Sequence, residues 1–179
     1  MRLMSRKPIS MTAADSHDRF IALLDEHKGI VHKVASVYCR RPEDRPDLEQ
    51  EIVIQLFRSF SRFDGRSRFS TWMYRVAMNV AISFYRSDRR SASRTVPIEG
   101  SGIEMVAAAE PSTEILQLRA FISQLDDLNR GLILLYLEGH TYEEMAEVTG
   151  LTLTNVATKI SRIKGELRRA FATTTETGE

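Results

Sequence analysis

The chain has 179 residues, 42% of them hydrophobic, and a formal net charge of +1. This length suits one domain or two small ones, and this composition is ordinary for a globular protein. The small net charge excludes a protein that attracts nucleic acid over its whole surface. Basic residues instead cluster at 86–94 and 159–169, and acidic residues at 43–51 and 143–147, which favours basic surfaces for one kind of partner and acidic surfaces for another.

Cys39 is the only cysteine, so no disulfide can form within the chain, and a reducing compartment is consistent with that. The sequence has no run of 18 apolar residues and no signal-peptide pattern at its start. We therefore expect a cytoplasmic protein without membrane insertion. His17, His27, His32 and Cys39 are spaced by ten, five and seven residues, which does not match the usual metal-ligand pairs, so we expect no metal and no cofactor.

Residues 1–14 are expected to form a mobile leader, and a helical domain is predicted over 15–92. The apolar positions between Phe20 and Tyr38 recur at helical spacing and predict a first helix, with a break at Gly29. Pro42 and Pro46 then bracket the loop before the next helix.

A second helix is predicted to begin at Asp47, whose carboxylate would form a capping box with Gln50. One apolar stripe follows, formed by Leu48, Ile52, Val53, Leu56, Phe57, Phe60 and Phe63. Burial of that stripe leaves Glu49, Glu51 and Gln55 on the opposite face. From the pattern alone, these polar residues indicate a solvated face.

A third helix is predicted after the polar loop 64–68, in which Gly65 is free to adopt a positive φ. Ser70 is its expected N-cap. Its apolar side consists of Phe69, Trp72, Met73, Val76, Ala77, Val80, Ala81 and Phe84. A stripe of this kind usually packs in a core.

Another side of the third helix carries Arg75, Asn79, Ser83, Arg86 and Arg90, at steps of four, four, three and four residues. The residues that run alongside are Tyr74, Met78, Ile82 and Tyr85. Guanidinium groups bind phosphates, Asn pairs with an adenine edge, and aromatic rings stack on unpaired bases. This side therefore suits nucleic acid. The alternative is a second packing face in a helix bundle.

Residues 93–112 are rich in Ser, Gly, Pro and Ala and have no apolar periodicity. A stretch of this length is long for a loop inside one compact domain, so we interpret it as a linker. A second domain is predicted over 113–172, followed by a tail at 173–179.

The second domain has the pattern of a helix-turn-helix. Two helices over 115–125 and 128–137 are predicted, the second ending at Gly139. Thr141 and Glu144 form a capping box for a short helix that ends at Gly150, and Thr152 caps the last helix. The exposed residues in the first half of that helix include Thr154, Asn155, Thr158, Lys159 and Arg162. In a helix-turn-helix these residues face the major groove, where Asn155 and Arg162 are the expected base readers. The alternative is a helical hairpin with a basic solvated face.

Together these patterns predict an all-α protein, with an N-terminal helical bundle and a C-terminal helix-turn-helix domain joined by a flexible linker. The sequence shows no phosphate-binding glycine loop, no nucleophile with an adjacent base and no metal cluster. We therefore expect no enzymatic activity.

Four segments of the chain resemble the RNA polymerase sigma factors. They are Asp47-Leu48-Glu49-Gln50-Glu51, the aromatic-rich stretch 57–63, the run Arg68-Phe69-Ser70-Thr71-Trp72-Met73-Tyr74-Arg75-Val76-Ala77-Met78-Asn79, and residues 141–169. The similarity is greatest to the small, two-domain extracytoplasmic-function (ECF) group of the sigma-70 family. It extends from about Asp18 to Phe171 and includes both domains in the family's order.

The resemblance implies two macromolecular partners, core RNA polymerase and promoter DNA. Asp47, Gln50 and Glu51 match the family's residues that bind the polymerase clamp. The residues implied at the −10 element are Arg68, Phe69, Trp72, Arg75, Asn79, Ser83 and Arg86. The residues implied at the −35 element are Thr154, Asn155, Thr158, Lys159 and Arg162. An anti-sigma factor and a monomeric free state are implied as well.

This chain departs from the family pattern at Ala157, where many relatives carry Lys or Arg, and at Leu125-Asp126, in place of Leu-Pro. The −35 sequence that it reads is therefore not implied. The alternative function is a stand-alone helix-turn-helix regulator that acts without polymerase docking. That alternative explains residues 141–169, but it does not explain the polar face at 47–51 or the stripe from Arg75 to Arg86.

Overall fold

The computed structural model describes residues 13–91 and 112–175, and every regular element in those two ranges is a helix. The α-helices are α1 (Ala13–Tyr38), α2 (Arg45–Ser59), α3 (Phe69–Ser91), α4 (Thr113–Gln124), α5 (Asp127–Leu137), α6 (Tyr142–Thr149) and α7 (Leu153–Thr175). Two short 3-10 helices, η1 (Pro42–Asp44) and η2 (Phe60–Arg62), flank α2. The all-α prediction is confirmed. Most of the predicted leader, linker and tail lies outside the described residues.

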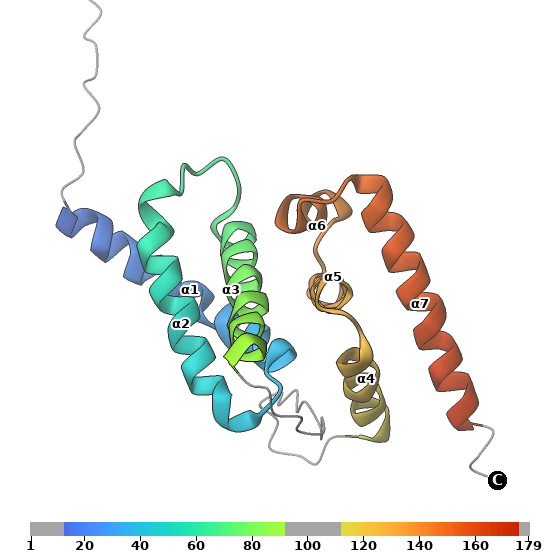
Figure 1. Ribbon diagram of the computed structural model, residues 1–179. Helices are drawn as coiled ribbons and strands as arrows, with labels where there is room; N and C mark the ends of the chain where they lie inside the picture. The colour runs from blue at the N-terminus through green and yellow to red at the C-terminus, as the bar shows by residue number, and fades with distance from the viewer. Residues whose placement is uncertain (1–12, 92–111, 176–179) are drawn as a thin grey trace, which may run out of the picture.

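Helices α1, α2 and α3 form one half of the molecule, and α4 to α7 form the other (Figure 1). Helix α1 runs without interruption from Ala13 to Tyr38, so the predicted break at Gly29 is wrong. The apolar positions keep their helical spacing past Gly29, and Ile30, Val31 and Val34 are all buried. Their burial outweighs the roughly 1 kcal/mol that a glycine costs inside a helix.

Helix α2 begins at Arg45, two residues before the predicted start. Pro46 lies in its first turn, where the missing N–H of proline costs no hydrogen bond. The capping box of Asp47 with Gln50 is therefore wrong, because both residues are already inside the helix. Asp47 instead places a carboxylate in the first turn, where the helix dipole favours a negative charge.

Helix α3 begins at Phe69, so Ser70 lies in its first turn and the prediction of Ser70 as N-cap is also wrong. The N–H of Trp72 donates to the carbonyl of Arg68 at 3.1 Å, which makes Arg68 the residue that precedes the helix. The loop before it has the expected glycine conformation, since Gly65 has a φ of 74°. Asp64 stabilises this turn by accepting a hydrogen bond from the N–H of Arg66 at 3.1 Å.

An aromatic cluster joins the three helices of the first half. Phe60 lies at its centre, with ring centres 5.2 to 6.3 Å from those of Phe20, Phe63, Phe69 and Trp72. The rings meet largely edge to face, which is the favourable arrangement for aromatic pairs. In the predicted stripe of α2, Leu48, Ile52 and Leu56 are fully buried beside this cluster, but Phe57 is 51% exposed, so its predicted burial is wrong.

In the second half, Arg130 of α5 closes the end of α4. Its guanidinium donates to the carbonyl oxygens of Ser123 at 2.9 Å and Leu125 at 3.1 Å, and more distantly to that of Ile122. The last carbonyls of a helix lack the usual partner one turn further on; here the N–H of Leu125 donates to the carbonyl of Ile122 at 3.2 Å, and the buried arginine supplies the remaining donors. Asp126 begins α5 by accepting a hydrogen bond from the N–H of Asn129 at 2.8 Å.

The predicted helix-turn-helix is present in α6 and α7. Thr141 Oγ1 accepts from the N–H of Glu144 at 3.2 Å, and Glu144 Oε2 accepts from the N–H of Thr141 at 3.0 Å. Gly150 ends α6 with a φ of 73°. Thr152 then caps α7 by accepting from the N–H of Asn155 at 3.3 Å. The capping box, the glycine turn and the second cap are all confirmed.

The two halves pack directly on each other. Helix α1 contacts α5, helix α3 contacts α6, and the buried apolar residues of both halves form one continuous cluster. The sequence predicted two domains and a linker, and it gave no prediction of the contacts between the domains.

We expect Leu56→Ala to lower the free energy of unfolding by about 2–5 kcal/mol, because it leaves a cavity in the first half of the core. Leu116, whose side chain is half exposed on α4, provides a matched control. Leu116→Ala should cost about 0.5 kcal/mol or less. Urea titrations followed by circular dichroism measure both, and equal losses would contradict the assigned core.

Candidate nucleic-acid interface

The stripe predicted from the sequence lies along one side of α3. Asn79 and Ser83 are exposed, and Arg75 is partly exposed. Arg86 follows on the same helix, but its side chain is outside the described residues. We refer to Arg68, Arg75, Asn79 and Ser83 as the DNA face of α3. Its amide, hydroxyl and guanidinium groups can donate hydrogen bonds to base edges and phosphates.

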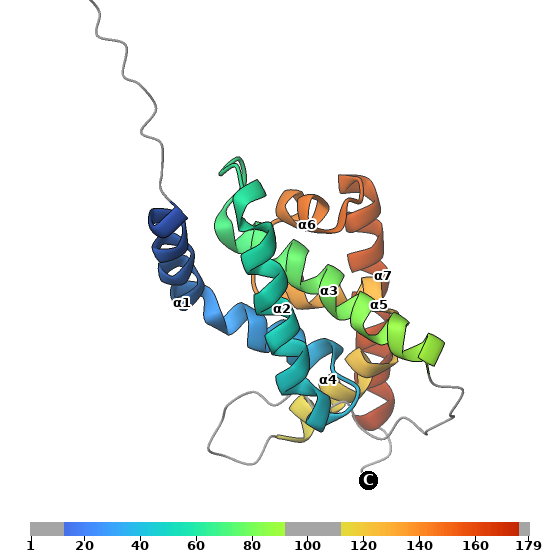
Figure 2. The same ribbon diagram turned by 60° about the vertical axis from the view of Figure 1, so that its left-hand side comes forward.

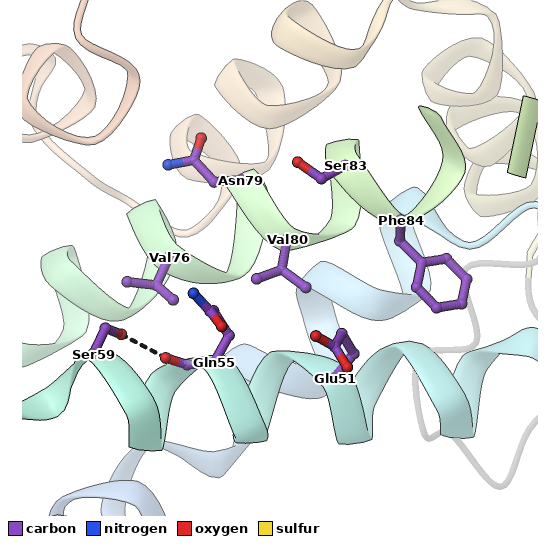
Figure 3. Close-up of a pocket in the computed structure, with 8 residues that line it drawn as sticks. All are labelled: Glu51, Gln55, Ser59, Val76, Asn79, Val80, Ser83 and Phe84. Carbon is purple, nitrogen blue, oxygen red and sulfur yellow. Dashed lines mark hydrogen bonds between the residues drawn. The ribbon is translucent and has the colours of Figure 1, made fainter. Parts of the chain in front are cut away.

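A groove of about 570 Å³ separates α2 from α3. Its lining residues are Glu51, Gln55, Ser59, Val76, Asn79, Val80, Ser83 and Phe84. Figure 3 shows Glu51 and Gln55 on α2 and, facing them from α3, Val76 and Val80, whereas Asn79 and Ser83 point from α3 away from α2. The lining of the groove thus includes both Glu51, predicted to bind polymerase, and Asn79, predicted to bind DNA. This shared lining was not predicted, because it depends on how α2 packs on α3.

The polar face of α2 consists of Asp47, Gln50 and Glu51, all exposed. Their predicted position away from the apolar stripe is confirmed. Glu49 is different, since its carboxylate contacts His32 Nδ1 of α1 at 2.9 Å. Asp47, Gln50 and Glu51 thus face solvent, whereas Glu49 pairs with α1.

Phe69 and Trp72 lie in the aromatic cluster, with 8% and 9% of their surface exposed. Their predicted core position is confirmed. A role for these two residues at the −10 element stays a prediction, because in this structure their rings contact Phe60 and Phe63. From this position, the two rings fix the first turn of α3 on the core.

Tyr74, Met78 and Tyr85 were expected to run along the exposed stripe, and that expectation is wrong, since all three are buried. Tyr74 and Met78 face the second half of the molecule. The hydroxyl of Tyr74 donates to Glu138 Oε2 at 3.4 Å, and its ring meets that of His140 edge to face at 5.0 Å. Burial raises the pKa of Tyr74 above its ordinary value, and the carboxylate of Glu138 acts in the same direction.

Two arginines of the first half pair with acidic residues of α6. Arg68 Nη1 lies 3.2 Å from Glu144 Oε1, and Arg75 Nη2 lies 3.2 Å from Glu147 Oε1. The sequence contained a signal for these contacts in the acidic cluster at 143–147. Periodicity within single helices could not show that this cluster meets α3.

The predicted −35 residues lie on α7, which packs on α4, α5 and α6 through Val156, Ile160 and Ile163. Thr154, Asn155, Thr158 and Arg162 are exposed. Lys159 is partly buried, and its Nζ donates to Asn129 Oδ1 at 3.4 Å. Helix α7 lies at the end of the molecule opposite α2 (Figure 1).

Within residues 13–91 and 112–175, no three His, Cys, Asp or Glu side chains are grouped closely enough to hold a metal ion. A search of the same residues finds no helix with the length and apolar character needed to span a membrane.

A bundle that presents amide, hydroxyl and guanidinium groups on one helix, followed by a helix-turn-helix, defines a two-part DNA-binding protein. Residues 23–91 match the Sigma-70 region 2 family, and residues 115–167 match Sigma-70, region 4. The ECF RNA polymerase sigma-E factor of Escherichia coli K12 is 33% identical over 148 residues, which cover 74% of this chain and 78% of that protein. The Haemophilus influenzae sigma-E factor is 28% identical, covering 81% and 83%. The chain belongs to the ECF sigma factors of the sigma-70 family, and as such it is an alternative sigma factor that directs RNA polymerase to promoters.

Two solved structures share this fold. One is the sigma factor RpoE in complex with the anti-sigma factor NepR from Bartonella quintana, with a TM-score of 0.70, 19% identity and coverage of 89% of this chain and 98% of RpoE. The other is CnrH in complex with the cytosolic domain of CnrY, with a TM-score of 0.64, 20% identity and coverage of 90% and 95%.

We expect Glu144→Gln to remove a pH-dependent part of the stability. The N–H of Thr141 lowers the pKa of Glu144 below its ordinary value of 4.5, nearby His140 and Arg68 lower it further, and partial burial opposes them. A lowered pKa in the folded state stabilises the fold above the ordinary value, and this stabilisation is lost as the pH falls through the folded-state pKa.

The wild type should therefore exceed Glu144→Gln in unfolding free energy at neutral pH, and the difference should shrink as the pH falls below the ordinary value through the folded-state pKa of Glu144. The matched control is Glu143→Gln, which removes an exposed carboxylate from the same helix. A difference between the wild type and Glu144→Gln that stays constant with pH would contradict the assignment.

Proposed function

We propose that this sigma factor acts through three surfaces: the polar face of α2 binds core polymerase, the DNA face of α3 captures the −10 element, and α7 reads the −35 element. The observation that carries this proposal is the groove between α2 and α3, which Glu51 and Asn79 both line. Polymerase docking and base capture would then share one rigid unit.

The polymerase surface consists of Asp47, Gln50 and Glu51. These side chains are exposed on one helix whose opposite side is fixed by Leu48, Ile52 and Leu56. A carboxylate on such a rigid helix costs little conformational entropy to position. We infer that it pairs with basic groups of the polymerase clamp, where complementary charge would speed encounter and determine orientation.

At the −10 element the protein would trap bases that have left the duplex rather than break the base pairs itself. Stacking and hydrogen bonding contribute about 1–3 kcal/mol per captured base, comparable with the few kcal/mol that unstacking costs. Asn79 and Ser83 would bind the captured strand, and Arg75 and Arg86 its phosphates. The aromatic cluster under α3 would hold these groups in place. This mechanism needs no hydrolysis and no cofactor.

At the −35 element α7 would enter the major groove, with Asn155 and Arg162 reading base edges. Thr154, Thr158 and Lys159 would contact the backbone or neighbouring bases. Each of the two DNA contacts alone would be weak. Polymerase would hold both at the promoter spacing and convert them into one strong interaction through a high effective concentration.

We infer that the protein acts in the cytoplasm, beside polymerase and the chromosome, and that an anti-sigma factor controls it. The similarity in fold to RpoE and CnrH, which were solved with NepR and with the cytosolic domain of CnrY, supports this inference. Such a partner would compete with polymerase for the groove between α2 and α3.

We expect Glu51→Lys to weaken binding to core polymerase by about tenfold or more, or ~1.4 kcal/mol, because it reverses a charge at the docking face. Anisotropy of the labelled protein titrated with core polymerase measures the affinity. Glu26→Lys, the same change on α1 where the side chain is 69% exposed, should bind normally. Unchanged affinity of Glu51→Lys would contradict the assignment of Glu51 to the polymerase-docking face.

Asn79→Ala should keep its affinity for polymerase but reduce open-complex formation by about tenfold, because a well-placed amide contributes about 1–3 kcal/mol to base recognition. Permanganate reactivity of promoter thymines reports the melted bases. Thr158→Ala on α7 should instead affect the −35 contact alone. Normal reactivity in Asn79→Ala would contradict the −10 assignment.

A further inference from the structure

Gly165 lies inside α7, where no contact within the described residues accounts for a glycine. Helix α7 runs from Leu153 to Thr175, and α4, α5 and α6 pack along one side of it (Figures 1 and 2). A Cβ atom added at Gly165 would have no heavy atom within 4 Å. The backbone at Gly165 is helical. Neither close packing nor a special backbone conformation therefore requires a glycine at this position.

A glycine inside a helix is unfavourable unless something compensates for it. Relative to alanine, it lowers the ratio of folded to unfolded protein about fivefold. At Gly131 the compensation is visible, since a Cβ atom there would lie 2.1 Å from Met78 Cε. Gly165 has no corresponding neighbour. A contact that α7 makes only with a partner outside the chain would supply the missing reason.

The side chains around Gly165 indicate what that partner is. Thr158, Arg162, Gly165 and Arg169 follow one another at steps of four, three and four residues, which places them along one face of α7. The side chains of Thr158, Arg162 and Arg169 are exposed. Gly165 therefore lies between two arginines, each about one turn away. This surface suits an anion that approaches the helix backbone closely.

Gly29 of α1 provides a comparison within the same chain. A Cβ atom there would also have nothing within 4 Å. The residues at the same offsets from Gly29 are Glu26 and Lys33, which have opposite charges. Open space alone thus does not define a site. The paired arginines distinguish Gly165 from Gly29.

The position of Gly165 along α7 points to the DNA backbone. Gly165 lies twelve residues after Leu153, which is about 18 Å along the helix axis. The major groove is only about 12 Å wide. A helix whose first half lies in the groove therefore reaches the rim, where the phosphates lie, near Gly165. Arginine binds such phosphates, and these contacts determine the register of the protein on the duplex.

We propose that Gly165 is a close-approach site for the sugar–phosphate backbone at the rim of the −35 major groove. The absence of a side chain lets the DNA strand lie against the helix backbone. Arg162 can then reach a base edge on the groove side while Arg169 binds a phosphate on the other side. The proposal rests on the −35 role of α7 under the proposed function. It adds a residue that governs how deeply α7 enters the groove.

The test compares Gly165→Ala and Gly165→Leu with Gly29→Ala in the full chain. Urea titration measures stability, and both alanine variants should raise the ratio of folded to unfolded protein about fivefold. Anisotropy at low salt with a fluorescein-labelled DNA duplex of mixed sequence measures affinity, because phosphate contacts do not depend on sequence. Gly165→Ala should weaken binding about threefold and Gly165→Leu about tenfold. Gly29→Ala should bind as the wild type does.

The dependence of affinity on salt should also change. Its logarithmic slope should become shallower by about 0.9 for each phosphate contact that Gly165→Leu removes. A loss of affinity that grows with the size of the side chain supports exclusion of the DNA strand. Equal losses in Gly165→Ala and Gly165→Leu would instead indicate a need for a flexible helix, and they would overturn the proposal. Unchanged affinity in both variants would overturn it as well.

Arg162→Ala separates this proposal from the assignment on which it rests. If Arg162→Ala weakens binding while the two Gly165 variants bind normally, the close-approach site is wrong and the −35 role of α7 stands. If Arg162→Ala and both Gly165 variants all bind normally, the −35 role of α7 is wrong too. Both alanine variants favour the helix, so a loss of affinity in Gly165→Ala alone cannot come from unfolding.

Discussion

The packing of α3 on the aromatic cluster is the interaction on which the rest of the structure depends. Phe69 and Trp72 fix the first turn of α3 against Phe60, so the helix cannot rotate about its axis. That orientation places Val76 and Val80 in the groove with α2, and it places Tyr74 and Met78 toward the second half. The polar residues between these two apolar sides remain at the surface. One helix therefore meets the bundle core, the groove and the second half of the molecule with three different sides.

The sequence predicted the features that depend on neighbouring residues. Both caps of the helix-turn-helix and the turn at Gly150 follow from residue types at fixed offsets, and the structure has them all. Helix starts were predicted less well, because Pro46 favours an earlier first turn than Asp47 would. Periodicity showed that α3 has a second amphipathic side, but it could not identify what covers that side. The covering carboxylates belong to residues 138–147, more than sixty positions away from Tyr74.

The contacts that close the molecule are individually weak. The side chain of Arg68 is 81% exposed and those of Arg75 and Glu147 are 42% and 43% exposed, and ion pairs of this kind contribute about 0–1 kcal/mol each. The buried apolar contacts between the halves, among them that of Gly131 with Met78 and Tyr38, are more extensive, since α1 packs on α5 and α3 packs on α6.

The groove between α2 and α3 also has a consequence for engineering. Glu51 and Asn79 both line this groove, so residues chosen to change the proposed −10 preference also alter the shape of the surface beside the proposed polymerase contact. Helix α7 lies on the far side of the second half from α2 (Figure 1). Under the proposed assignments, the −35 preference could be changed by replacing residues of α7 alone. The −10 preference can be redesigned only together with α2.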